Sequence, residues 1–343
     1  MSAGPSAVVN PGPASYAGEE EAREQMDRQV TPKLLYITYS SHSGSTLLSL
    51  LLNTHPDIMA IGHMTGWPFP EDEEFRCSCG ELIEDCPFYR SVMAAYEAAG
   101  LRFDPRDFGT DYKLSQNFRL NRYLIGSLPL VQSAAAERLR DRLLGLLPST
   151  RAMIARTDRA NLLFVETAQA YSGAKVIVDK STRSHRVRFL KNVPGLELHA
   201  IHLIQDPRSV IYSDIAGRNW SAARGIENWL SRNRLIFHNL SGVQRKMTVF
   251  YEDLTDRTDQ ALAAIHRFVG LAPRPFPGDF KIGEHHVLGN EMRHGSSKIQ
   301  KDVRWRSNLS AGDLAQIEGQ AWAFAKRHGD HPLSGVIRHY LEA

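Results

Sequence analysis

Small residues with hydroxyl groups are concentrated in one segment near the start of the chain. The segment reads Ser40-Ser41-His42-Ser43-Gly44-Ser45-Thr46 and lies between a bulky apolar run and a run of leucines. In such a turn, successive backbone N–H groups converge on one anion at a helix N-terminus, where the helix dipole also favours negative charge. The segment therefore predicts an anion-binding loop. The alternative is an ordinary helix capped by serine or threonine.

This segment lacks a lysine. The phosphate loop of nucleoside triphosphatases ends in Gly-Lys-Ser/Thr, and its lysine reaches the β and γ phosphates. Here Gly44 is followed directly by Ser45 and Thr46. The sequence therefore disfavours a P-loop kinase or a GTPase.

The elements that must position this loop follow from the apolar runs. Strands are expected at residues 34–39, 175–178, 198–204 and 248–251, and helical patterns follow them at 45–53, 184–191, 207–216 and 257–269. Strands separated by helices pair in parallel and carry helices on both faces. The sequence thus predicts an α/β three-layer sandwich with a P-loop-like turn. Its central, mainly parallel sheet is expected to have four to five strands flanked by helices.

The remaining segments set the expected domain boundaries. Residues 1–30 hold too few apolar side chains to offset the cost of ordering and are expected to be a disordered tail. Residues 31–343 are expected to form a single domain, in which a helical insertion occupies about 88–172. A basic helix is expected after Ser181, and its charges are expected to face solvent at Arg183, Arg186, Arg188 and Lys191.

Composition excludes several classes of protein. The 343 residues include 41 Lys and Arg against 38 Asp and Glu, a formal net charge of +3. That excess is too small and scattered for nucleic-acid binding, which needs a concentrated basic face. No apolar run approaches the roughly 20 residues of a membrane span, and the N-terminus lacks the pattern of a signal peptide. We therefore expect a cytoplasmic protein without a membrane span, and a homo-oligomer is compatible with the sequence.

The three cysteines lie close together, at Cys77, Cys79 and Cys86. An odd number in a long chain argues against a secreted disulfide framework. With a fourth ligand such as a histidine, the three thiols would suit Zn²⁺, but the spacing C-x-C-x₆-C does not match the common zinc fingers. A structural loop with reduced thiols is the preferred interpretation, and no metal is expected.

Six segments resemble, in the expected order, bacterial-type sulfotransferases that use 3′-phosphoadenosine-5′-phosphosulfate (PAPS). They are residues 43–48 with Asn53-Thr54-His55-Pro56, residues 77–80 with Cys86-Pro87-Phe88, residues 178–181, residues 206–210 with Ser213, residues 250–254, and Gly289-Asn290 with Arg293. The resemblance implies a sulfotransferase fold and an enzyme that takes PAPS as sulfuryl donor. It also implies a small-molecule or carbohydrate acceptor that receives the group on a hydroxyl or amine.

The resemblance further implies which residues hold the donor. Residues 43–48 would contact the 5′-phosphosulfate, residues 206–213 the 3′-phosphate, and a loop at 281–307 would close over the nucleotide. The implied donor-binding set is Ser41, His42, Ser43, Gly44, Ser45, Thr46, Arg208, Ser213, Tyr251, Asn290 and Arg293.

Sulfuryl transfer needs stabilised charge on the leaving oxygen and a base near the acceptor's proton. His42 stands where the family usually has Arg or Lys, so a protonated His42 or Lys180 is expected to supply the charge. His63 is the candidate base because a histidine accepts a proton near neutral pH. The alternative for His63 is a local hydrogen bond in a loop. The acidic run at residues 71–74 is a reserve.

Two departures from the family pattern keep a second function open. Gln205 stands where the family's first phosphate-binding Arg is usual, and His42 replaces a permanent cation. A bidentate Arg contact with phosphate is stronger than an amide contact. The alternative to a PAPS-dependent sulfotransferase is therefore a nucleotide-binding protein of this type with lost or altered activity.

Overall fold

The computed structural model describes residues 31–66, 76–115, 117–126, 134–280, 286 and 299–342. The chain from Pro32 onward forms one compact unit. Several expectations lie outside the described residues and stay predictions. They concern the tail at 1–30, the acidic run at 71–74, Asn290 and Arg293.

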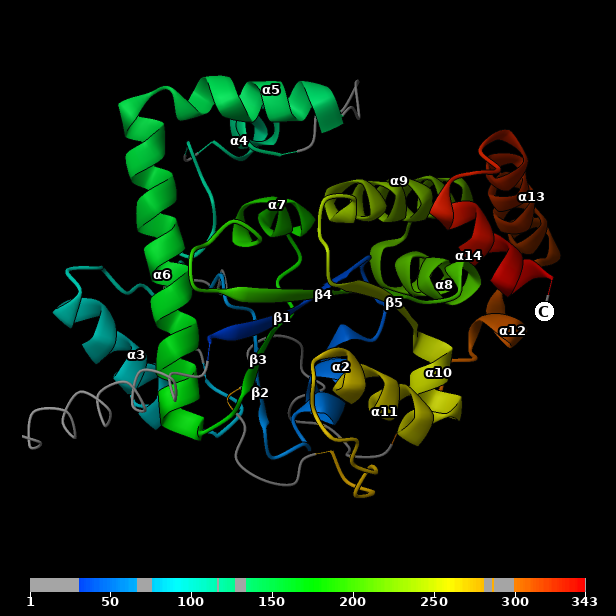
Figure 1. The fold of residues 1–343 in the computed structure, drawn as a ribbon. Coiled ribbons are helices and arrows are strands. Elements are labelled where there is room, and N and C mark those ends of the chain that lie inside the picture. Colours follow the sequence, from blue (N-terminus) through cyan, green and yellow to red (C-terminus); the bar gives the residue numbers. More distant parts are fainter. Residues whose placement is uncertain are drawn as a thin grey trace, which may run out of the picture. The chain divides into compact units, whose positions relative to one another are not determined.

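Five parallel strands form the centre of this unit (Figure 1). In spatial order they are β2 (Ile58–Gly62), β3 (Val176–Asp179), β1 (Lys33–Tyr39), β4 (Glu197–Ile204) and β5 (Lys246–Phe250). Every neighbouring pair runs parallel. The predicted α/β fold class, with a parallel sheet flanked by helices, is confirmed.

Strand β1 shows why this sheet needs two helical layers. Its side chains alternate between opposite faces of the sheet. Leu34 and Tyr36 join one buried cluster, whereas Leu35 and Ile37 join another. All four are fully buried. Burial on both faces is typical of a parallel sheet covered by helices on each side.

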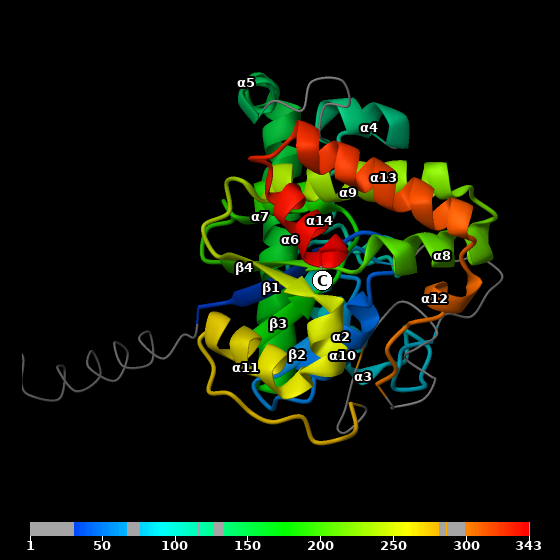
Figure 2. The same ribbon diagram turned by 90° about the vertical axis from the view of Figure 1, so that its right-hand side faces the viewer.

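The helices divide between these two faces and one end of the sheet. On the Leu35 face lie α2 (Ser45–Leu52), α10 (Tyr251–Asp256) and α11 (Thr258–Phe268). On the Tyr36 face lie α3 (Pro87–Ala98), α6 (Pro148–Ser172), α7 (Val187–Leu190) and part of α9 (Ala222–Leu240). A third cluster joins the rest of α9 to α8 (Pro207–Arg218), α13 (Ala311–Arg327) and α14 (Pro332–Leu341) (Figure 2).

The remaining helical segments are short or peripheral. They are α4 (Phe118–Leu124), α5 (Ala134–Gly145), the 3₁₀ turn η1 (Ser184–Arg186) and α12 (Trp305–Asn308). The stretch expected to be a helical insertion thus holds α3 to α6. Among the described residues, no helix combines the length and the apolar character that crossing a membrane requires.

Strand β2 was not expected from the sequence. Its apolar run is short and closely follows the leucines of α2, and periodicity alone does not separate such a run from a continuing helix. Polar side chains make the turn between them. The side chain of Asn53 accepts the N–H of Ala60 at 2.8 Å, and His55 Nδ1 accepts the N–H of Asp57 at 3.1 Å.

The expected solvent-facing basic helix at 184–191 is wrong for its central arginines. Arg186 is fully buried, with Nη1 2.6 Å from Asp179 Oδ2, and Arg188 Nη1 lies 3.0 Å from Glu137 Oε2. The segment is split into η1 and α7, which pack against α6 and α9. This packing removes the arginines from water, so each is paired with a carboxylate.

Candidate active site

A cleft with a volume of about 840 Å³ opens at the carboxyl ends of the strands. Its walls include residues that follow successive strands. Among them are Ser41 after β1, His63 after β2, Lys180 after β3, Gln205 after β4 and Tyr251 after β5. Ligands of open α/β sheets bind at this edge, where helix N-termini also meet. The fold therefore brings several predicted site residues, far apart in sequence, to one place.

The loop between β1 and α2 forms one wall of the cleft. His42 and Gly44 both have left-handed backbone, with φ of 59° and 76°. Ser43 Oγ donates to the carbonyl oxygen of Ser40 at 2.7 Å, which holds the loop in a tight turn. No side chain caps α2, and its first turn holds no acidic residue. Its first N–H groups are therefore free of the usual capping partner and suit an anion.

Gly44 is required by a close approach as well as by its backbone. A Cβ built on Gly44 would lie 2.3 Å from Cδ2 of Tyr251. The aromatic ring of Tyr251 thus packs directly against the loop, and the Tyr251 hydroxyl donates to the carbonyl oxygen of Gln300 at 3.1 Å. These contacts hold together the loop, the start of α10 and the segment after residue 298.

Lys180 carries its charge into the interior beside this loop. Only 1% of Lys180 is exposed, and its Nζ lies 3.2 Å from Thr46 Oγ1 and 3.5 Å from His63 Nε2. The backbone N–H of Lys180 donates to the carbonyl oxygen of Gly62 at 2.7 Å, which joins the ends of β2 and β3. Two of the predicted catalytic residues are therefore neighbours.

The neighbouring Asp179 holds the backbone around Lys180 and His63 in place. Its Oδ1 accepts the N–H groups of Ser181 at 2.7 Å and of Met64 at 3.2 Å, while its Oδ2 accepts from buried Arg186. Arg186 in turn donates to Asn161 Oδ1 on α6 at 2.8 Å. The backbone on both sides of the Lys180–His63 contact is thus tied to one buried ion pair.

Both predicted site histidines favour the neutral form. Burial and the positive charges of Lys180 and Arg186 hold the pKa of His63 well below its usual value of 6.5. Burial also lowers the pKa of His42, although Asp214, 3.6 Å away, acts in the opposite direction. Protonation of His42 near neutral pH is therefore disfavoured. Lys180 is the better source of a permanent positive charge at this loop.

Comparison with known proteins adds a likeness in fold. No family model and no curated protein matches the chain. The sulfotransferase domain of the Synechococcus PCC 7002 olefin synthase is 18% identical, with 86% of this chain and 96% of that chain covered and a TM-score of 0.45. The sulfotransferase domain from the curacin biosynthetic pathway is 16% identical, with 84% and 97% covered and a TM-score of 0.47.

A sulfotransferase from Mycobacterium tuberculosis H37Rv is 15% identical, with 75% of this chain and 72% of that chain covered and a TM-score of 0.36. These structural neighbours are all sulfotransferases. This likeness concerns the fold.

The structure separates the two predicted ligands for the donor's 3′-phosphate. Ser213 lines the cleft, as does Gln205, whose Nε2 donates to Ser209 Oγ at 2.8 Å. Arg208 is instead engaged with acidic partners, at 2.7 Å from Asp206 and 3.1 Å from Glu318. Its guanidinium also stacks over the ring of Trp305, 4.4 Å from the centroid. This geometry occupies Arg208 within the protein.

Three cations of the cleft were missed by sequence reasoning, namely Arg218, Lys301 and Arg304. Arg218 ends α8 and lies 2.7 Å from Asp214, whereas Lys301 and Arg304 pair with Asp256 and Asp302. Lys301 and Arg304 lie within the loop expected at 281–307, although neither was named as a site residue. Arg218 lies outside the family-like segments, and its only sequence signal was the i, i+4 spacing with Asp214, which indicates a helical ion pair rather than a site.

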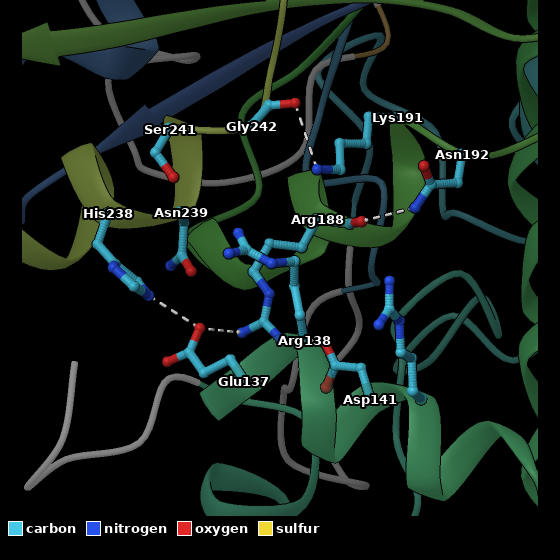
Figure 3. A pocket seen from close by; sticks show the side chains of 11 residues that line it. Glu137, Arg138, Asp141, Arg188, Lys191, Asn192, His238, Asn239, Ser241 and Gly242 are labelled. Carbon is cyan, nitrogen blue, oxygen red and sulfur yellow. Dashed lines mark hydrogen bonds and ion pairs between the residues drawn. The ribbon is translucent and has the colours of Figure 1, made fainter. Parts of the chain in front are cut away.

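A second hollow, of about 390 Å³, lies between α5, α7 and α9 (Figure 3). Charged side chains line it, and several of them pair with one another. Glu137 accepts from His238 at 2.8 Å and from Arg188 at 3.0 Å, and Lys191 Nζ donates to the carbonyl oxygen of Gly242 at 3.2 Å. The arrangement is that of an ion-pair network between helices.

Proposed function

We propose that the protein transfers a sulfuryl group from PAPS to a hydroxyl or amine of a small-molecule or carbohydrate acceptor. The observation that carries this proposal is the contact of buried Lys180 with Thr46 at the N-terminus of α2, with His63 beside it. The transfer creates negative charge on the leaving phosphate oxygen. A permanent cation and helix N–H groups held in advance at one point stabilise such charge.

The chemical step needs one bond broken, one bond formed and one proton moved. The bond between the donor's sulfur and its bridging phosphate oxygen breaks, and a bond forms between that sulfur and the acceptor oxygen or nitrogen. The acceptor's proton passes to a base, for which we propose neutral His63. Lys180 stabilises the leaving oxygen, and the Ser43–Thr46 backbone orients the phosphosulfate. No metal takes part in this step.

The donor's 3′-phosphate requires a second set of anion-binding groups in the cleft. We propose that Ser213 and Arg218 contact this group, because both line the cleft near the end of α8. Arg218 pairs with Asp214 and is half-exposed, so a phosphate entering the cleft can share its guanidinium. This assignment moves the arginine role from Arg208 to Arg218.

A nucleotide-binding protein without transfer activity remains the second candidate. It is favoured by Gln205, which offers an amide where a guanidinium is usual, and by the lowered pKa of His42. Both features weaken the charge around the donor's phosphates. Such a protein would bind the nucleotide product and carry out no transfer.

Thermal melting distinguishes these candidates from other nucleotide-binding proteins. Adenosine 3′,5′-bisphosphate, the nucleotide product of every PAPS-dependent transfer, is expected to raise the melting temperature, whereas ATP is not. A ligand at 100 times its dissociation constant stabilises the native state by about 2.7 kcal/mol. A larger shift with ATP would contradict both candidates. Transfer of sulfate to an acceptor then separates the enzyme from the binding protein.

A further inference from the structure

Four side chains that ligate transition metals converge behind α3. Three come from one segment and the fourth from more than 190 residues later in the chain. They are Cys77, Cys79, Cys86 and His286, and their ligand atoms all lie within 4.8 Å of one another. We propose that these four side chains bind one structural Zn²⁺ ion.

The distances between the ligand atoms suit a tetrahedral ion. Nδ1 of His286 lies 3.1 Å from Sγ of Cys86 and 3.5 Å from Sγ of Cys77. With Zn–S bonds near 2.3 Å and Zn–N bonds near 2.0–2.1 Å, neighbouring ligand atoms of a tetrahedral site are separated by about 3.5–3.8 Å. An ion therefore fits after small shifts of the thiols.

The histidine is oriented as a metal ligand requires. Its Nδ1 faces the thiols, while its Nε2 lies 3.4 Å from the hydroxyl of Tyr171 on α6. Metal-binding histidines commonly donate their second ring N–H to such an oxygen, which fixes the tautomer and the ring. The ring of Phe88 packs 5.4 Å from the imidazole and limits its movement.

The backbone around the cysteines directs N–H groups at their sulfur atoms. Gly80, at φ 99°, closes a tight turn in which its N–H donates to the carbonyl oxygen of Cys77 at 3.0 Å. Backbone N–H groups also hydrogen-bond to all three sulfurs. The donors are Cys79, Glu81 and Tyr89. Such donors stabilise the thiolates that zinc requires.

The alternative is a set of reduced thiols buried for packing alone. Cys77 and Cys86 are fully buried and His286 is 2% exposed, so burial alone would be compatible with it. Packing does not explain why a third thiol and an imidazole nitrogen converge on the same point. The sequence did not predict the site because the three thiols have an uncommon spacing and the fourth ligand lies far along the chain.

Four protein ligands leave no open position, so the ion would be structural rather than catalytic. It would tie residue 286 to the start of α3, whose N-cap is Cys86. Residue 286 lies in the chain between α11 and the segment that lines the cleft at Lys301 and Arg304. The proposal does not depend on sulfuryl transfer and can fail or hold separately.

Metal analysis of the full chain tests the proposal. The reduced protein, reconstituted with Zn²⁺ and freed of excess ion, is expected to contain one zinc per chain by mass spectrometry of the elements. His286→Asn and Cys86→Ser should lose most of it. His328→Asn, at a histidine outside the cluster, should retain it. Equal zinc in all four proteins, or no zinc in the wild type, would overturn the site.

A second measurement uses the wild-type chain alone. Replacement of Zn²⁺ by Co²⁺ in the wild-type chain should give the intense visible bands of tetrahedral cobalt with thiolate ligands. Addition of Zn²⁺ should remove these bands. The weak spectrum of octahedral cobalt, unaffected by Zn²⁺, would contradict a site made of three thiolates and one imidazole.

Discussion

Among single residues, Lys180 is central to the proposed chemistry. An ammonium group is strongly hydrated, and its transfer out of water carries a large free-energy cost. Yet Lys180 is 1% exposed and lies against Thr46 and His63 at the carboxyl edge of the sheet. A role in stabilising an anion in the cleft accounts for this position.

Replacement of Lys180 by methionine should therefore impair turnover more than donor binding. Removal of one preorganised group that stabilises developing charge typically lowers kcat by about 10²- to 10³-fold, and we expect a loss in that range. Lys175→Met is the matched control, because Lys175 is exposed and pairs with Asp57 at 3.2 Å. Steady-state kinetics of both variants provide the measurement, and equal kcat values would contradict the role of Lys180.

Replacement of Gly44 should impair the binding of the nucleotide. Gly44→Ala places a Cβ against the ring of Tyr251. It should weaken the binding of adenosine 3′,5′-bisphosphate by at least about tenfold, or 1.4 kcal/mol. Gly173→Ala is the control, because Gly173 has a similar φ of 70° and nothing near the added carbon. Both share a backbone strain of about 1–2 kcal/mol. Calorimetry should show weaker binding in the Gly44 variant alone.

The pH dependence of turnover tests the assignment of His63 as base. A base acts in its neutral form, and the pKa of His63 is held well below 6.5 by burial and by the charge of Lys180. The midpoint of the acidic limb of the kcat/KM profile should therefore lie well below pH 6.5. In Lys180→Met the repulsive charge is gone, so that limb should move to higher pH. An acidic limb at the same pH in both proteins would rule out this coupling.

Sequence reasoning reached some of these residues and not others. Lys180 could be predicted because it directly follows an expected strand in a family-like segment. His63 was predicted from the chemistry of histidine, since the strand before it was not expected. Arg218 could not, since nothing in a helical Asp-x-x-x-Arg spacing shows that the pair faces a cleft. The ion pairs of Arg208 with Asp206 and Glu318 were equally hidden, because Glu318 lies on α13, far along the chain.

At the scale of elements, the site depends on how the ends of β2 and β3 are joined. Asp179 ends β3, and it bonds both the Ser181 and the Met64 backbone as well as Arg186. The charges of Asp179 and Arg186 are fully removed from water, with 0% exposure of both side chains. Breaking one partner of such a pair leaves an uncompensated buried charge.

Arg186→Met should therefore lower the free energy of unfolding by about 3–5 kcal/mol. Arg257→Met is the control, because Arg257 pairs with Asp253 on the surface, where ion pairs contribute about 0–1 kcal/mol. Denaturant unfolding of both variants measures the difference. A loss below about 1 kcal/mol in Arg186→Met would mean that this ion pair does not hold the strand ends.

The elements themselves were largely predictable, with instructive exceptions. Four strands were expected within two residues of their observed bounds, because long apolar runs followed by small residues permit few alternatives. Strand β2 was missed because its pairing with β3 depends on the polar turn made by Asn53 and His55, not on its own pattern. The solvent exposure of the basic helix was predicted wrongly because its packing against α6 and α9 depends only on tertiary structure.

At the scale of the whole molecule, buried histidines make stability depend on pH. Burial lowers the pKa of each of four histidines to between about 3 and about 4: His185, His199, His202 and His266. Below pH 6.5 the unfolded chain takes up protons that the folded chain does not, so stability must fall as the pH falls. Each histidine contributes about 1.4 kcal/mol per pH unit in this range.

His202→Gln should accordingly reduce the slope of unfolding free energy against pH between about 6 and 4. The expected reduction is about 1.4 kcal/mol per pH unit. His202 is buried and its Nε2 bonds Asn233 at 2.9 Å, so glutamine can keep a polar contact there. Denaturant unfolding at several pH values provides the measurement, and an unchanged slope would show that His202 does not stay neutral in the folded state.

The central claim concerns the chain as an enzyme, and one assay addresses it regardless of the acceptor. Release of adenosine 3′,5′-bisphosphate from PAPS is common to every transfer, so it can be followed while hydroxyl and amine acceptors, including saccharides, are added in turn. We predict acceptor-dependent release by the wild type and by Lys175→Met, and release about 10²- to 10³-fold slower by Lys180→Met. Tight binding of the bisphosphate with no acceptor-dependent release in any of the three proteins would contradict the account.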